Sequence, residues 1–180
     1  MQDTNMLDIA VAYNRYRFLG NEFLTWIWFA IENDEDIIRR CDPDIQSLDV
    51  GNRMVLEHRW ANGIETVAIK GDAAGLEEGL LALSKGAQVT EINLIYKSGS
   101  LQWQFSLKGE SLSFSGLKLP ETAAAEQSED MEGIVLEKLY LYEKPFNFID
   151  ELYRLFIELR LSRQWDENLT GMKKWIQTGR

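Results

Sequence analysis

With 180 residues, of which 45% are hydrophobic, the chain is long enough to form one domain around its own hydrophobic core. Its single cysteine, Cys41, excludes a disulfide framework and a thiolate metal cluster, and without a run of about 18 apolar residues no transmembrane helix is predicted. The formal net charge of −10 argues against a nucleic-acid-binding surface that covers the whole molecule, although one local basic face would still attract phosphate.

The N-terminal ten residues carry Asp3 and Asp8 and no basic residue. A signal peptide begins with positive charge and continues with an apolar segment, so none is predicted here. Together with the lone cysteine, this favours a cytoplasmic location.

The first predicted element is a helix over residues 19–33, with Asn21 as its N-cap. Apolar side chains cover nearly its whole circumference, and such a helix must be buried on more than one side. It is therefore either the central helix of the domain or part of an interface with another chain. The candidate interface residues are Trp26, Trp28 and Phe29.

A strand pair follows, over residues 53–60 and 64–70, joined by Ala-Asn-Gly at 61–63. Asn-Gly is typical of tight hairpin turns because both residues tolerate positive φ angles. A short amphipathic helix is predicted within residues 71–86, and Gly86 is expected to end it in a left-handed conformation.

Three more strands are predicted over residues 88–96, 101–107 and 112–119, where apolar and polar residues alternate. Strict alternation indicates a sheet that is packed on one face and wet on the other. The residues expected on the wet face are Gln102, Gln104, Ser106, Lys108, Ser113 and Ser115.

Residues 120–130 are rich in Ala, Glu and Ser and are expected to form a flexible linker. Beyond it the apolar spacing becomes helical. A first helix is predicted over 134–142 and should stop near Pro145, because proline has no backbone N–H. A second follows from Phe148 to Leu159, and a third contains Trp165 to Ile176 with Ser162 as its cap.

The predicted fold is therefore α+β: an antiparallel sheet of about five strands packs on an apolar N-terminal helix, with a C-terminal bundle of two to three helices. Residues 1–119 form the α+β core, 120–130 the linker, and 131–180 the helices that pack on the core.

Nothing in the chain matches a catalytic, cofactor or metal motif. His58 is the only histidine, and no nucleophile pattern surrounds it, so a structural or surface role is favoured. Glu65 and Lys70 on one strand allow a weak nuclease hypothesis, and the acidic groups at 34–36 and 129–132 are typical of solvated surface. We therefore expect the protein to bind no cofactor and to have no enzymatic activity.

Basic residues form local groups in spite of the acidic total. Arg160, Arg163, Lys173 and Lys174 fall near the last two predicted helices, and Lys70, Lys97 and Lys108 fall at strand ends. Either these charges are scattered and solubilising, or several converge on one DNA-facing surface, as phosphate binding requires. The first four are the candidate nucleic-acid contacts.

Residues 18–29, Phe-Leu-Gly-Asn-Glu-Phe-Leu-Thr-Trp-Ile-Trp-Phe, resemble the C-terminal part of the longer members of the RdgC-like, recombination-associated family. Residues 51–56, residues 80–83 running into the next strand, and residues 155–162 followed by Trp165 agree with it. The resemblance implies a cytoplasmic, nucleoid-associated protein that is not an enzyme. It also implies ring-like dimers that hold duplex DNA without strong sequence preference and restrain the recombinase.

Three hypotheses result. The first is a non-enzymatic, RdgC-like protein that associates with double-stranded DNA, as a homo-oligomer or with a second chain, and modulates recombination or nucleoid structure. The second is an acidic protein-interaction module, acting as a DNA mimic or as a subunit of a complex. The third is a metal-dependent hydrolase that uses the carboxylates.

Overall fold

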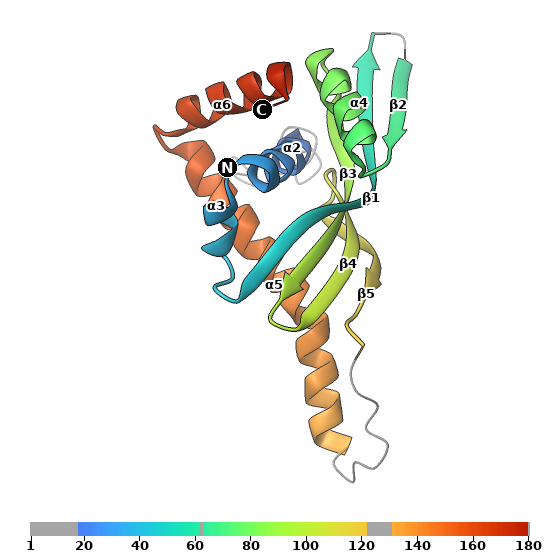
Figure 1. Ribbon diagram of the computed structural model, residues 1–180, viewed down its shortest axis with the longest axis vertical. Helices are drawn as coiled ribbons and strands as arrows, with labels where there is room; N and C mark the ends of the chain where they lie inside the picture. The colour runs from blue at the N-terminus through green and yellow to red at the C-terminus, as the bar shows by residue number, and fades with distance from the viewer. Residues whose placement is uncertain (1–17, 62, 122–130, 180) are drawn as a thin grey trace, which may run out of the picture.

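The computed structural model describes residues 18–61, 63–121 and 131–179 (Figure 1). Helices α2 (Phe18–Asn33) and α3 (Glu35–Arg39) precede strands β1 (Ile45–Trp60) and β2 (Gly63–Ile69). Helix α4 (Ala73–Ser84) leads to strands β3 (Gln88–Ser98), β4 (Leu101–Lys108) and β5 (Ser113–Lys118), and helices α5 (Met131–Leu161) and α6 (Trp165–Thr178) end the chain. The predicted α+β class is confirmed. No described helix is both long and apolar enough to cross a bilayer.

The five strands form one antiparallel sheet in the order β2-β1-β3-β4-β5. The predicted hairpin is confirmed, although Gly63 pairs with Trp60 as the first residue of β2, and Asn62 lies outside the described residues. Strand β1 begins at Ile45, well before the predicted residue 53. Its early part was missed because a bulge between Val50 and Met54 breaks the alternation.

Helix α2 is the centre of the core. Phe23, Leu24 and Ile27 are at most 1% exposed, and so are both of its tryptophans. Phe23 lies 5.4 Å from the ring of Phe156 in α5. The helix therefore buries its apolar circumference against the sheet on one side and the C-terminal helices on the other, as a helix without a polar face must.

The prediction that α2 forms an interface with another chain is wrong for Trp26 and Trp28. Both are 1% exposed and fully packed within their own chain. Trp28 meets Trp175 of α6 edge-on at 5.0 Å, and half-buried Phe29 lies 5.6 Å from the same ring. Trp28 and Phe29 thus pack on α6, whereas the Trp26 ring lies 5.5 Å from that of Phe156 in α5; the sequence pattern alone did not bring these helices next to α2.

Asn21 is not an N-cap, because α2 already includes Phe18. Its amide instead donates to the side chain of Gln88 (3.3 Å), which ties α2 to β3. Gln164 occupies the N-cap position of α6, two residues after the predicted Ser162, whose hydroxyl accepts from the Gln164 N–H. Gly86 has the expected positive φ, +95°. Of the predicted linker, residues 122–130 lie outside the described chain.

Helix α5 runs without interruption through Pro145, so the prediction that a helix stops there is wrong. Proline removes the N–H that would bond to the carbonyl of Leu141, one turn earlier. The indole Nε1 of Trp103 in β4 donates to that carbonyl oxygen at 2.8 Å. The sheet thus supplies the hydrogen bond that the helix lacks, and the C-terminal bundle consists of two described helices.

Replacing Trp103 by Phe should lower the free energy of unfolding by about 1–3 kcal/mol, because the Leu141 carbonyl loses the donor that stands in for the missing helical N–H. In a Pro145→Ala background the same change should cost less, since the introduced alanine supplies an N–H within the helix. Urea denaturation of the four proteins of this double-mutant cycle measures the difference. Equal losses in both backgrounds would contradict the pairing of Trp103 with the proline.

Candidate nucleic-acid interface

Of the four predicted DNA contacts, Arg160 is engaged in packing. Its Nε lies 3.2 Å from a carboxylate oxygen of Glu22, and its guanidinium lies 4.9 Å from the ring centroid of Trp165. The side chain is only one-third exposed. Arg160 therefore joins the end of α5 to both α2 and α6 rather than presenting a charge to solvent.

The other three predicted contacts lie on the helical side of the molecule. Lys173 and Lys174 are exposed on α6, and exposed Arg163 lies in the turn that precedes this helix. Asp166 and Glu167 occupy the first turn of the same helix, so its surface carries both signs of charge. The structure thus places these three on or beside one helix, and their role in binding DNA is a prediction.

A second polar surface lies on the face of β3, β4 and β5 that is turned away from the helices. Residues such as Tyr96, Trp103 and Phe105 are fully buried on the helical face, and the residues between them point the other way. The predicted wet residues of β4 and β5 are all exposed or half-buried here. We call this surface the open sheet face; it comprises Glu91, Asn93, Ile95, Lys97, Gln102, Gln104, Ser106, Lys108, Ser113, Ser115 and Lys118.

A chain of side-chain hydrogen bonds crosses the open sheet face. Lys118 Nζ donates to Gln104 Oε1 (3.1 Å), and Gln104 Nε2 donates to Asn93 Oδ1 (2.9 Å). Asn93 Nδ2 then donates to the hydroxyl oxygen of Ser106 (3.0 Å), whose own proton is left to donate elsewhere. Asn93, at the centre of this chain, is only 7% exposed and serves to hold its neighbours. Half-buried Gln104 and Ser106 and exposed Lys118 are thus fixed in place, so they have little rotamer entropy left to lose when they bind a ligand.

The open sheet face is locally basic. On β3, β4 and β5 its charged residues are Lys97, Lys108 and Lys118 against one carboxylate, Glu91, which is the cross-strand neighbour of Lys108. Exposed Asp49 of β1, the cross-strand neighbour of Ile95, adds a second carboxylate at the border of this face. In a chain with a net charge of −10, this local excess of positive charge stands out. The sequence indicated Lys97 and Lys108 as residues at strand ends but missed Lys118, because strict alternation over residues 112–119 would place it on the side of Leu112 and Phe114. A register shift between Gln104 and Ser106 turns Lys118 to the face of Gln104 instead.

The residues of the nuclease hypothesis do not assemble. Lys70 lies one residue beyond β2, and its separation of five residues from Glu65 corresponds to roughly 17 Å of extended chain. His58, opposite Glu65 in the hairpin, stacks on Trp60 with ring centroids 3.7 Å apart. Among the described residues there is no group of three or more His, Cys, Asp or Glu placed to hold a metal ion.

The most connected buried polar group is Asp42, which precedes β1. Tyr96 and Ser98 of β3 donate hydroxyl hydrogen bonds to its Oδ2, the latter at 2.7 Å, and Lys144 Nζ of α5 lies 3.4 Å from the same oxygen. Burial by itself raises the pKa of Asp42, but these hydrogen bonds, that from the Asp44 N–H and the charge of Lys144 together hold the pKa below its usual value. Asp42 thus links three elements as an anion.

The neighbouring Cys41 does not turn this cluster into a nucleophilic site. Burial, with a further contribution from Glu151, raises the pKa of its thiol to about 11, so the thiol is protonated at neutral pH. The pKa of Tyr96 is likewise raised by burial and by Asp42, which keeps the phenol a donor. The arrangement fits a structural clamp.

Because it contains an ionised carboxylate, the clamp should make the free energy of unfolding depend on pH in the acidic range. Because the folded-state pKa of Asp42 lies below the unfolded value of about 3.9, its contribution is complete at neutral pH and is lost as the pH falls through the folded value. Asp42→Asn should cost about 1–3 kcal/mol at pH 7 and progressively less as the pH is lowered below about 3.9. Denaturation at pH 7 and over a descending series of acidic pH values checks this, with exposed Asp36→Asn as control; a cost that does not fall with the pH would contradict it.

Comparison with known proteins identified no relative of this chain. No protein-family model, no curated protein and no solved structure matches this chain.

Proposed function

We propose that this is a non-enzymatic, cytoplasmic, RdgC-like protein that associates with duplex DNA and modulates recombination or nucleoid structure. The observation that supports the proposal best is the open sheet face, where a hydrogen-bonded amide chain and three lysines lie on one surface. The resemblance of residues 18–29 to the family supports it independently.

The side chains of this face are those that contact the DNA backbone. Half to two-thirds of protein–DNA hydrogen bonds go to phosphate and sugar, from Lys and Arg as well as Ser, Asn and Gln. Such contacts position a duplex without reading its sequence, which agrees with binding of weak sequence preference. The acidic remainder of the surface repels phosphate and would therefore confine DNA to the locally basic side.

The number of lysines sets the expected salt dependence. The logarithm of the binding constant falls with the logarithm of salt concentration with a slope of about −0.9 for each phosphate neutralised. Three lysines therefore predict a slope of about −3 for each protein copy, and measurable retention only in low salt. Several copies on one duplex would raise the apparent affinity without any new contact.

Changing Lys97, Lys108 and Lys118 to Gln one at a time should reduce the slope by about 0.9 each, and the triple variant should lose binding. Fluorescence anisotropy with duplexes of unrelated sequence, over a series of low salt concentrations, measures this. Lys138→Gln, on exposed helix surface, is the matched control. Lys173→Gln with Lys174→Gln tests the helical side separately.

Wild-type protein that fails to retain long duplex DNA in low salt at high protein concentration would overturn the proposed function. Sheet variants that bind like wild type while the Lys173/Lys174 variant does not would move the contact to α6.

A second candidate function, the acidic protein-interaction module, is favoured by a different surface. The first half of α5 projects beyond the sheet (Figure 1), and it exposes large apolar side chains. These are Val135, Leu136, Leu139, Tyr140 and Tyr142, each between 48% and 59% exposed. Apolar patches of this kind mark contacts with another chain. This candidate expects a stable protein complex and no DNA retention, so the low-salt binding experiment separates the two.

A further inference from the structure

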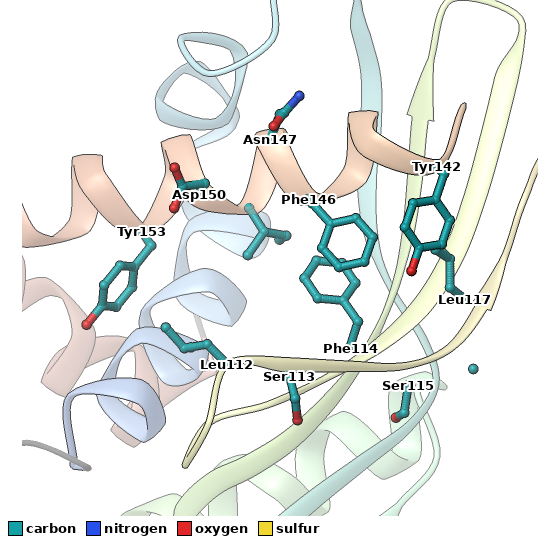
Figure 2. A pocket seen from close by; sticks show the side chains of 12 residues that line it. Leu112, Ser113, Phe114, Ser115, Leu117, Tyr142, Phe146, Asn147, Asp150 and Tyr153 are labelled. Carbon is teal, nitrogen blue, oxygen red and sulfur yellow. The ribbon is translucent and has the colours of Figure 1, made fainter. Parts of the chain in front are cut away.

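An open groove of about 750 Å³ runs between β5 and α5. Figure 2 shows the rings of Phe114 and Phe146 facing each other between the two elements, with Ser113 and Ser115 pointing away from the helix; the two ring centroids lie 4.1 Å apart. Both walls of the groove are apolar and aromatic. The large side chains that line it are Leu112, Phe114 and Leu117 from the strand and Tyr142, Phe146 and Tyr153 from the helix.

Strand β5 borders this groove as an edge of the sheet. Among the described residues it pairs with β4 only. An edge strand presents backbone N–H and C=O groups to which a further strand can add, and charged residues along an edge commonly prevent this. In β5 the one charged residue is Lys118, at the very end. Gly116, with a φ of +62°, interrupts the strand, so residues 113–115 are the regular part of the edge.

Helix α5 carries an apolar seam with the spacing of a coiled coil. The intervals between its members alternate between four and three residues, the pattern that keeps one side of a helix turned toward a partner helix. The first three members are between 48% and 59% exposed, on the half of α5 that projects beyond the sheet (Figure 1). The last three are buried or half-buried beneath β5 and beside α2. The seam comprises Val135, Leu139, Tyr142, Phe146, Ile149 and Tyr153.

The edge and the seam face the same side of the molecule. Helix α5 lies beneath β4 and β5, because Trp103 of β4 bonds to the Leu141 carbonyl and Phe114 of β5 packs on Phe146. If β5 paired with a copy of itself, the two α5 axes would lie between two and three strand spacings apart, about 10–14 Å. Packed helices lie about 8–10 Å apart, and the distance depends on the contacting side chains, which here include tyrosine and phenylalanine. One symmetric contact can therefore cover both features.

We propose that this side of the molecule binds a second copy of the chain. Strand β5 pairs antiparallel with the same strand of the partner, about a two-fold axis near Phe114, and the two α5 seams pack antiparallel beneath the joined strands. The spacing of the seam reads the same in both directions, so Tyr142 meets the partner's Phe146 and Val135 meets the partner's Tyr153. Such a contact is isologous, with one patch serving both copies.

Charge and area agree with this occupant. Antiparallel pairing places Lys118 and the partner's Lys118 at opposite ends of the joined strands, so the two charges do not repel each other. Val135, Leu136, Leu139 and Tyr142 expose roughly 400 Å² in each copy, and with the groove walls and the strand edge two copies would bury about 1,000 Å² or more, the size at which an interface becomes specific.

The inference does not depend on the proposed DNA binding. The contact would nevertheless join the open sheet faces of the two copies into one surface, with three lysines from each. It would also cover the apolar part of α5 that favours the acidic protein-interaction module, and so remove the support for that second candidate.

The seam gives the first test. Leu139→Glu and Val135→Glu should each raise the dissociation constant of the dimer by about tenfold or more, because they place an unpaired carboxylate in the contact. Tyr140→Glu is the matched control: Tyr140 is 53% exposed, but it lies about 100° further round the helix and off the seam. Sedimentation equilibrium of the full chain measures the dissociation constants, and circular dichroism verifies that each variant is folded.

Amide hydrogen exchange tests the strand pairing. In the wild-type protein, exchange within residues 113–115 should be about tenfold slower above the dissociation constant than below it, and in Leu139→Glu it should not depend on concentration. Four results would each overturn the proposal: a wild-type chain that stays monomeric at high concentration, a dimer that both seam variants leave intact, a dimer that Tyr140→Glu weakens equally, or exchange of residues 113–115 that is the same in monomer and dimer.

Discussion

A hydrogen bond between a strand and a helix ties the longest helix of the fold to the sheet. Pro145 leaves the carbonyl of Leu141 without its helical donor, and the Trp103 indole of β4 supplies one at 2.8 Å. The bond satisfies this carbonyl where the 31-residue helix α5 passes through Pro145, and it joins the helix to the sheet at the same place. Just beyond it, Phe148 stacks on Tyr96 with centroids 4.3 Å apart. The Leu141 carbonyl would destabilise the fold if it were buried without a donor; with Trp103 as its donor it helps to position α5 on the sheet.

Because α5 and α2 take up the apolar face of the sheet, the other face is left to water. The helical side holds the aromatic core, including Phe23, Trp26 and Phe156. The opposite side holds amides, hydroxyls and lysines fixed by mutual hydrogen bonds. One face of the sheet is thus used for packing, and the other is exposed to solvent and its ligands. For this reason we place the proposed DNA contact on the strands rather than on α6.

The ionisable groups around Asp42 and Arg160 hold elements of the fold together. Asp42 is held as an anion between β3 and α5, and Cys41 is held as a thiol. Arg160 has a similar structural part at the other end of α5, where it meets Glu22 and Trp165. Charges that the sequence offers as binding residues are therefore divided by the structure: some stabilise the contacts between helices, and others remain on the surface.

The sequence by itself determined the α+β class, an apolar N-terminal helix, the hairpin, the meander and the wet residues from Gln102 to Ser115, because each of these rests on local periodicity or turn chemistry. It did not determine that α5 continues through Pro145 or that Trp28 is covered by Trp175, since both need a partner from a distant part of the chain. Lys118 reaches Gln104 only because β4 and β5 pair. Arg160, predicted as a DNA contact, instead forms an ion pair with Glu22, which is 138 residues away in the sequence. Local patterns record which face of an element is apolar, whereas the tertiary structure decides what covers that face and which charges remain exposed.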